Sequence, residues 1–268
     1  MTSSLPGNPQ PEQFVPFTAR LMAAIRAKET TRSDRLFNDP FAAQLAGEEA
    51  FAVLEQKLKV EDQAYVAVRT RLFDDFILSA SAKAHQVVIL ASGMDTRAYR
   101  LSWSSVTKIY ELDQPQVLKT KATILQEVVP NSQHCAISAD LTQPWSDLLF
   151  TKGYQPELPS VWLLEGLLMY LSEPEVHQLL ETISQLTATD SYLALDLVNV
   201  KGIEYEPYKG YFRSGFDYPE ELLAQYDWEA EVIQPGDEGA NFDRFIEPLP
   251  PRDVPDVARV FLVKAKKQ

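Results

Sequence analysis

Residues 87–101 read Val-Val-Ile-Leu-Ala-Ser-Gly-Met-Asp-Thr-Arg-Ala-Tyr-Arg-Leu, and this stretch decides the fold. Its first four residues, Val87 to Leu90, are apolar and mostly β-branched, which is typical of a strand buried on both faces of a parallel sheet. Asp95 predicts the start of a helix. Between the strand and this helix, three small residues predict a sharp turn: Ala91, Ser92 and Gly93. This geometry brings a cofactor close to main-chain N–H groups, although without a G-x-G-x-x-G pattern it also fits an ordinary α/β turn.

The next two predicted strands also end in acidic residues. Residues 108–113 predict a strand that ends with Glu111 and Asp113, and residues 134–138 predict one that runs into Asp140 and Leu141. Ligands in open α/β sheets bind beyond the carboxyl ends of the strands, where Asp113 is placed to accept hydrogen bonds from a ribose. Taken singly, each acid also fits a solvated strand end or a helix cap. Taken together, they predict a nucleoside site with the adenine near Asp140.

Composition excludes several classes of function. The chain has 268 residues and a net charge of −13, so we expect no nucleic-acid partner and no anionic membrane surface as partner. No apolar run is long enough for a transmembrane helix, and the N-terminus lacks the features of a signal peptide. The single cysteine, Cys135, excludes an internal disulfide and favours a cytoplasmic location. Three scattered histidines predict no metal site: His85, His134 and His177.

The chain divides into three predicted regions. Residues 1–14 are polar and rich in proline, which predicts a disordered N-terminus. Residues 15–85 have helical periodicity and predict a helical cap that is integral to the domain. From residue 86 to 268 strands and helices alternate, and the last two strands, near 228–233 and 257–264, have no helix between them. This order predicts a doubly wound, mostly parallel sheet of the Rossmann-like α/β class, with an antiparallel last strand.

Two further stretches of the core are candidates for function. Glu165 interrupts an apolar run, Val161 to Leu168, and an ionised carboxylate is rarely buried without a partner. It fits either a strand-end residue that reaches water or an arginine, or a group facing the ammonium of a bound amino acid. Residues 200–217 are rich in tyrosine, glycine and charge and lack periodicity, which predicts a lid or substrate loop rather than part of the core.

Five motifs resemble the leucine carboxyl methyltransferase family, including its bacterial branch of small-molecule O-methyltransferases. In chain order they are Arg26-Ala27-x-Glu29 with Asn38-Asp39-Pro40-Phe41, the stretch from Ser92 to Leu101, Tyr110-Glu111-Leu112-Asp113-Gln114-Pro115, Asp140-Leu141 before Trp145, and the stretch from Glu165 to Leu171. The resemblance covers roughly residues 15–265. It implies a class I methyltransferase fold and S-adenosylmethionine as the cofactor.

The resemblance implies a role for each motif residue. Asp113 is expected to hold the ribose, Asp140 and Leu141 the adenine, and Glu165 the ammonium of the cofactor. The turn residues are expected to lie along the methionine part of the cofactor: Ala91, Ser92, Gly93 and Asp95. Lys28 and Arg69 match positions that bind the cofactor carboxylate or the substrate. The family usually has glycine in place of Ala91 and alanine in place of Ser92, and a Cβ at residue 91 costs little only if its φ is negative.

The expected reaction is methyl transfer to an oxygen atom. A carboxylate is already ionised at neutral pH and needs orientation rather than a general base, and the sequence has no Ser-His-Asp or Cys-His arrangement. We therefore expect a carboxylate acceptor, on a small molecule or a peptide C-terminus, oriented by Arg69, Arg26 or Tyr170. Methylation of a phenol or enol is the alternative and needs a base such as His177. From other classes, a nicotinamide-dependent oxidoreductase and a non-catalytic cofactor-binding relative remain as alternatives.

Overall fold

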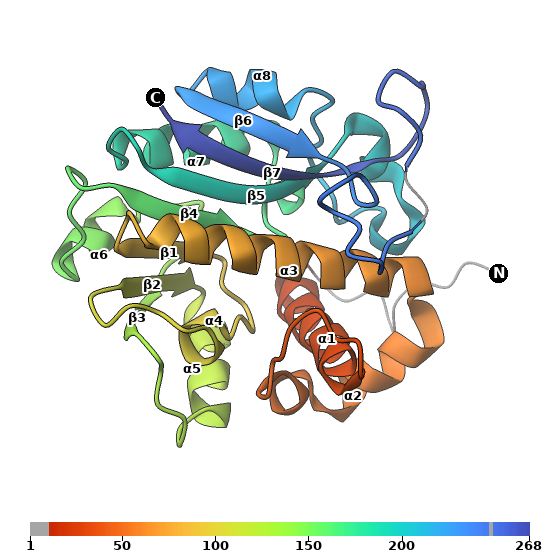
Figure 1. Cartoon of the computed structure of the whole chain (residues 1–268), viewed down its shortest axis with the longest axis horizontal. Helices are drawn as coiled ribbons and strands as arrows, with labels where there is room; N and C mark the ends of the chain where they lie inside the picture. Colours follow the sequence, from red (N-terminus) through yellow and green to blue (C-terminus); the bar gives the residue numbers. More distant parts are fainter. Residues whose placement is uncertain (1–10, 247–248) are drawn as a thin grey trace.

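The structure is a computed structural model that describes residues 11–246 and 249–268. Seven of its strands form one sheet in the order β3-β2-β1-β4-β5-β7-β6 (Figure 1). Strands β1 to β5 are parallel, and β7 is antiparallel to both of its neighbours. The strands are β1 (Gln86–Leu90), β2 (Lys108–Asp113), β3 (Gln133–Ser138), β4 (Ser160–Leu164), β5 (Tyr192–Val198), β6 (Trp228–Ile233) and β7 (Val260–Lys267). This confirms the predicted α/β fold with an antiparallel last strand.

Helices cover both faces of this sheet. They are α1 (Pro11–Thr31), α2 (Ala42–Lys57), α3 (Val60–Ser81), α4 (Arg97–Arg100), α5 (Pro115–Ile124), α6 (Ser146–Thr151), α7 (Glu173–Gln185) and α8 (Pro219–Ala224), with the 3-10 helices η1 (Leu168–Tyr170), η2 (Val200–Glu204) and η3 (Glu206–Tyr208). On β1, Val88 and Leu90 pack in the core that contains α6, α7 and α8, whereas Val87 and Ile89 pack against α3. The strand is therefore buried on both faces, as its apolar run predicts.

The N-terminal helices lie beside and across the sheet. In Figure 1, α3 crosses one face of the sheet, and α1 and α2 lie together next to it. Residues 1–10 of the predicted disordered N-terminus lie outside the described residues, whereas Pro11 already belongs to α1. Helical structure thus begins before the predicted boundary at residue 15. A proline at the start of the helix is compatible with this, since the first helical N–H groups have no intrahelical partner.

Two local predictions differ from the structure. The helix after β1 begins at Arg97 with Thr96 as its N-cap, and Asp95 lies before it, accepting a hydrogen bond from the Arg97 N–H at 2.7 Å. The last strand begins at Val260 rather than at Val257. The Asn199 amide accounts for this, since it donates to the Val257 carbonyl and accepts from the Arg259 N–H, so these backbone groups are not free for strand pairing.

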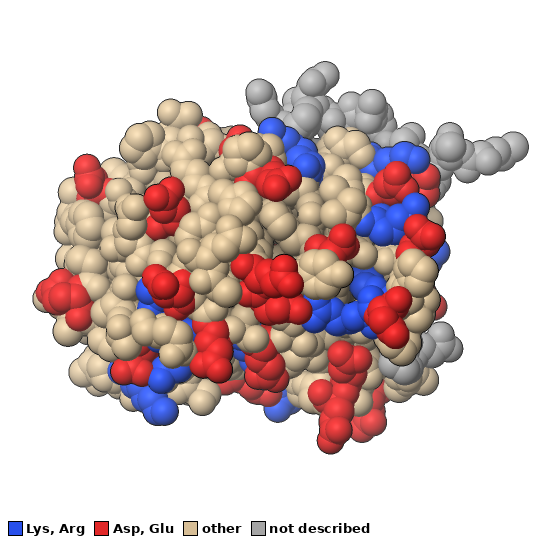
Figure 2. Space-filling view, turned by 90° about the horizontal axis from the view of Figure 1, so that it is seen from above, with Lys and Arg blue, Asp and Glu red and all other residues tan. Residues whose placement is uncertain are grey.

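The surface carries charges of both signs. Figure 2 shows Asp and Glu side chains spread over one face, with Lys and Arg side chains between them. Among the helices of the described residues, none is long and apolar enough to cross a membrane.

Candidate functional site

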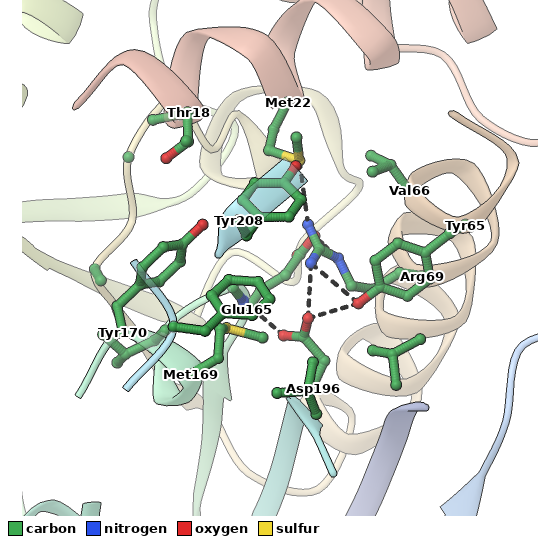
Figure 3. Close-up of a pocket in the computed structure, with 18 of the residues that line it drawn as sticks. Thr18, Met22, Tyr65, Val66, Arg69, Glu165, Met169, Tyr170, Asp196 and Tyr208 are labelled. Carbon is green, nitrogen blue, oxygen red and sulfur yellow. Dashed lines mark hydrogen bonds and ion pairs between the residues drawn. The ribbon is translucent and has the colours of Figure 1, made fainter. Parts of the chain in front are cut away.

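A cavity of about 540 Å³ opens where the parallel strands end. The segments that follow β1, β2, β3, β4 and β5 line it, together with residues of α1 and α3 and residues 202–213. Figure 3 shows Met22 of α1, Arg69 of α3 and Tyr208 of this last segment around it. Its position is the one that the strand-end argument predicts, because the carboxyl ends of parallel strands meet at one edge of the sheet.

The turn after β1 has an unusual backbone. Both Ala91 and Gly93 have a φ of +50°, in the left-handed region that glycine favours. A Cβ on Gly93 would lie 3.0 Å from the Cβ of Ala19 on α1, so the helix approaches the turn closely. An alanine at residue 91 would cost little only with a negative φ. Since the φ of Ala91 is positive, Ala91 carries backbone strain.

Asp113 holds this turn in place. Its Oδ2 accepts a hydrogen bond from the Gly93 N–H at 2.6 Å, and its Oδ1 accepts one from the Gln114 N–H at 2.6 Å. Burial raises the pKa of Asp113, and the two N–H donors oppose that shift. Each carboxylate oxygen can accept a second hydrogen bond, so the side chain that lines the cavity keeps capacity for two hydroxyl donors.

The loop after β3 supplies a second acceptor. Asp140 Oδ1 accepts hydrogen bonds from the backbone N–H and the hydroxyl of Thr142, at 2.9 and 2.7 Å. Its Oδ2 has no hydrogen-bond partner among the described residues. Asp140 and Leu141 both line the cavity, which gives it an amine acceptor beside an apolar side chain. Glu111, the other acid of β2, instead pairs with Lys121 at 2.8 Å and is fully buried away from the cavity lining.

Glu165 lies at the end of β4 between two arginines. Arg69 Nε is 2.9 Å from its Oε1, and Arg97 Nη1 is 2.7 Å from its Oε2. Burial alone would raise the pKa of Glu165, but the charges of Arg97 and Arg69 outweigh it and lower the pKa. Glu165 is therefore an ionised carboxylate that faces the cavity while its charge is balanced from α3 and α4.

Arg69 joins this carboxylate to a second one. Its Nη1 lies 2.7 Å from Oδ2 of Asp196, a fully buried residue of β5 that also accepts hydrogen bonds from the Tyr65 hydroxyl and the Gly166 N–H. Burial would lower the pKa of Arg69, but Asp196, Tyr65 and Glu165 together raise it well above the usual value. Arg69 Nη2 has only a weak contact, 3.8 Å from the sulfur of Met22 (Figure 3).

Most predicted site residues line this one cavity. They are Arg26, Arg69, Ala91, Ser92, Gly93, Asp95, Asp113, Asp140, Leu141, Glu165 and Tyr170. Lys28 does not belong to the cavity lining, because residues two apart on a helix differ in direction by about 200° and Arg26 faces the cavity. Arg26 itself is occupied, with its Nε 2.9 Å from Asp39 and its Nη2 donating to the Met94 carbonyl.

Three residues of the site were missed in the sequence. Asp196 interrupts the apolar run Leu195 to Val198 just as Glu165 interrupts its own, so the same pattern could have revealed it. Arg97 lies within the quoted motif but contacts Asp74, Asp95 and Glu165 only through folding. Tyr65 has no local signal, because its partner Asp196 is 131 residues away. Across the described residues, no cluster of His, Cys, Asp and Glu could hold a metal ion.

Comparison with known proteins connects this geometry to a family. A protein named "Putative S-adenosyl-L-methionine-dependent methyltransferase" from Parafrankia sp. is 40% identical over 206 residues, which cover 70% of this chain and 64% of that protein. One of the same name from Mycobacteroides abscessus is 40% identical over 195 residues, 67% of this chain and 64% of that protein. The chain thus spans less than two thirds of the length of these curated relatives.

Solved structures share the fold. A DUF574 family protein from Streptomyces avermitilis superposes with a TM-score of 0.65 at 13% identity, covering 94% of this chain and 97% of that one. A protein described as a "putative methyltransferase" from Thermobifida fusca gives a TM-score of 0.58 at 20% identity, covering 93% and 94%. The model of one family, leucine carboxyl methyltransferase, matches residues 19–184. With its sheet order, its strand-end acids and this match, the chain belongs to the leucine carboxyl methyltransferase family.

Proposed function

We propose that this protein transfers a methyl group from S-adenosylmethionine to a carboxylate of a small molecule. One observation carries the proposal: a single cavity at the strand ends contains nucleoside-type acceptors at Asp113 and Asp140, and also the paired groups Glu165 and Arg69. S-adenosylmethionine has a ribose, an adenine amine and an amino acid that require these kinds of partner. The names of the curated relatives also specify this cofactor.

The residues present fit this cofactor. The spare acceptor capacity of Asp113 suits the two ribose hydroxyls, and the free Oδ2 of Asp140 suits the adenine amine, with Leu141 beside the ring. Gly93 lets the backbone approach closely, because a side chain there would meet α1. Glu165 faces the cavity as an ionised group and would receive the ammonium.

A carboxylate acceptor fits the groups that line the cavity. When bound, S-adenosylmethionine supplies an electrophilic methyl group on a positively charged sulfur. A carboxylate oxygen of the acceptor forms the new O–C bond while the C–S bond breaks and its electron pair stays on sulfur, so no proton has to move. Within the described residues, no histidine lines the cavity, and this favours a carboxylate over a hydroxyl acceptor that needs a base.

Arg69 is the group best placed to orient that carboxylate. Its Nε and Nη1 are fixed by Glu165 and Asp196, which hold the guanidinium rigidly, while Nη2 has only the Met22 sulfur as a neighbour. A charge-assisted hydrogen bond to an acceptor oxygen would satisfy this donor. Arg26 is less suited, because two of its nitrogens already bind Asp39 and Met94.

Calorimetry tests the cofactor. We expect S-adenosylmethionine and S-adenosylhomocysteine to bind, and Asp113→Asn to weaken both by about tenfold or more, because a hydrogen bond to a charged group contributes about 1.5–3 kcal/mol. Asp253→Asn, an exposed acid outside the cavity, is the matched control. Absence of binding by the folded protein would contradict the proposal.

The stability of the methylated product in base shows which kind of atom accepts the methyl group. Methyl esters release methanol in mild base, whereas aryl methyl ethers and methylamines do not. We expect radioactivity from methyl-labelled S-adenosylmethionine to appear as base-released methanol when carboxylic acids are supplied. A label that resists base would instead establish methylation of a hydroxyl group or an amine.

A further inference from the structure

The part of the cavity away from the strand ends has a wall of four aromatic side chains. Tyr208 and Phe212 stack with ring centroids 4.9 Å apart and planes 5° apart, and Tyr205 stacks on Tyr208 at 6.3 Å. Tyr170 contacts Phe212 edge-to-face at 5.3 Å. All four residues line the cavity, and we call them the aromatic wall. Three of them come from the segment that the sequence predicts as a lid.

Hydrogen bonds fix the aromatic wall to the rest of the fold. The Tyr205 hydroxyl donates to Asp62 Oδ1 on α3 at 2.8 Å. The Arg213 N–H donates to the Met169 carbonyl at 2.7 Å, and the Ser214 hydroxyl donates to the Leu168 carbonyl at 3.0 Å. The rings are therefore held in place rather than packed at random, and they present a preformed surface to a ligand.

The facing side of the cavity carries several apolar side chains. Three apolar side chains line it: Met22 of α1, Leu58 at the C-terminal end of α2, and Val66 of α3. Figure 3 shows Val66 across the cavity from Tyr170. A planar group that enters between these side chains and the aromatic wall buries both of its faces. Aromatic contacts of this kind contribute beyond the burial of apolar area.

Two hydrogen-bond donors also line the cavity. The Tyr208 hydroxyl has no hydrogen-bond partner within residues 11–246 and 249–268, and Arg69 Nη2 has only the Met22 sulfur. Burial and the charge of Asp62 raise the pKa of Tyr208 to about 12, although the charge of Arg69 acts in the opposite direction. Tyr208 is therefore protonated at neutral pH and can donate a hydrogen bond.

Charge and size limit the rest of the ligand. Glu61 and Asp62 line the same part of the cavity, and Arg213, which also lines it, is paired with Glu175 at 3.0 Å. A second anionic group near Glu61 and Asp62 would therefore meet like charges. The cavity of about 540 Å³ has to accommodate the cofactor as well, which leaves space for one small molecule.

We propose that the acceptor is a compact, planar aromatic monocarboxylic acid, with its ring against the aromatic wall and its carboxylate on the Tyr208 hydroxyl and Arg69 Nη2. This inference rests on the proposed function and names its substrate class. The carboxylate would become a methyl ester, with S-adenosylhomocysteine as the second product. Phe212 then determines specificity for the ring, and Tyr208 binds the acid directly.

The test titrates acids into the complex with S-adenosylhomocysteine. The probes are trans-cinnamate, 3-cyclohexylpropanoate, which has a similar length but a non-planar ring, and 4-carboxycinnamate, which adds a second charge. We expect cinnamate to bind about tenfold more tightly than either of the others. Equal affinities, a preference for the diacid, or no binding of any acid would overturn the inference.

Two variants separate the roles of the ring and of the hydroxyl. Phe212→Leu keeps apolar bulk and should reduce the preference for cinnamate over the cyclohexyl acid about three- to tenfold. Tyr208→Phe keeps the ring and should weaken both acids about tenfold or more, with unchanged affinity for S-adenosylhomocysteine. Tyr218→Leu, an exposed aromatic outside the cavity, is the control.

The experiment distinguishes this inference from the proposed function. If S-adenosylhomocysteine does not bind, the proposed function fails together with the inference. If it binds and another class of carboxylic acid yields base-labile methyl groups, the proposed function stands and the aromatic acceptor is wrong. Variants that change all affinities equally would also overturn the assigned roles of Phe212 and Tyr208.

Discussion

Arg69 on α3 and Asp196 on β5 are 127 residues apart in the sequence and form an ion pair of 2.7 Å inside the protein. The pair connects the helical cap to the sheet at the point where β4 and β5 end. Arg69 also binds Glu165, so one guanidinium connects the cap to the ends of both β4 and β5. If the proposed cofactor binds at Glu165, its binding and the packing of the cap on the core are therefore physically linked.

Asp196→Asn should destabilise the protein by about 3 kcal/mol, because removing one partner of a buried ion pair leaves the other without its counter-charge. Urea unfolding measures this change in the free energy of unfolding. Asp253→Asn, on an exposed loop, should change it by less than about 0.5 kcal/mol. Equal effects of the two variants would show that the Arg69–Asp196 pair contributes nothing to stability.

Stability should fall in mild acid because several buried carboxylates have lowered pKa values. Burial would raise the pKa of Asp95, but Arg97 and other cations lower it to about 2, and the pKa of Glu165 is lowered as well. Their stabilisation is present above the unfolded-state values near 4 and is lost as the pH falls through the folded-state values. Asp95 alone accounts for about 2 kcal/mol.

Urea unfolding between pH 7 and pH 3 measures this dependence. Glu165→Gln should reduce the slope below about pH 4, because this variant no longer binds a proton on unfolding. An identical slope in the variant and the original protein would be evidence against a lowered pKa at Glu165.

As the pH is lowered, cofactor affinity should begin to decrease at a higher pH than it would if Asp113 had the pKa of an ordinary aspartate. Asp113 accepts hydroxyl hydrogen bonds best when ionised, and burial raises its pKa above 3.8. As the pH falls toward that raised value, protonation removes acceptor capacity, so the Kd for S-adenosylhomocysteine should increase. Calorimetry from pH 7 to pH 4.5 checks this, and in Asp113→Asn the dependence should be weaker. Parallel curves for the two proteins would assign the titration to another group.

Ala91→Gly should stabilise the protein by about 1 kcal/mol, because glycine removes the strain of a left-handed alanine. Ala122→Gly, on the exposed side of α5, should instead destabilise it by about 1 kcal/mol, as glycine does inside helices. Thermal or urea unfolding of both variants gives the comparison. Destabilisation by both changes would mean that Ala91 is not strained.

Local patterns predicted the elements that depend on neighbouring residues. The apolar run Val87 to Leu90 became β1, buried on both faces. The residues of this strand are consecutive in the chain, so the sequence pattern describes it directly. The last strand was placed too early, because Asn199, far away in the sequence, binds the backbone at Val257.

The sequence by itself determined the fold class and the acids at the strand ends. Alternating strands and helices dictate a parallel sheet whose carboxyl ends share one edge, and this places Gly93, Asp113 and Asp140 together without further information. Tertiary structure alone decided which cap residues reach that edge. The rotation of α1 turns Arg26 toward the cavity and Lys28 away from it, and the crossing of α3 brings Arg69 to Asp196. These contacts depend on how helices pack on the sheet, which no local spacing specifies.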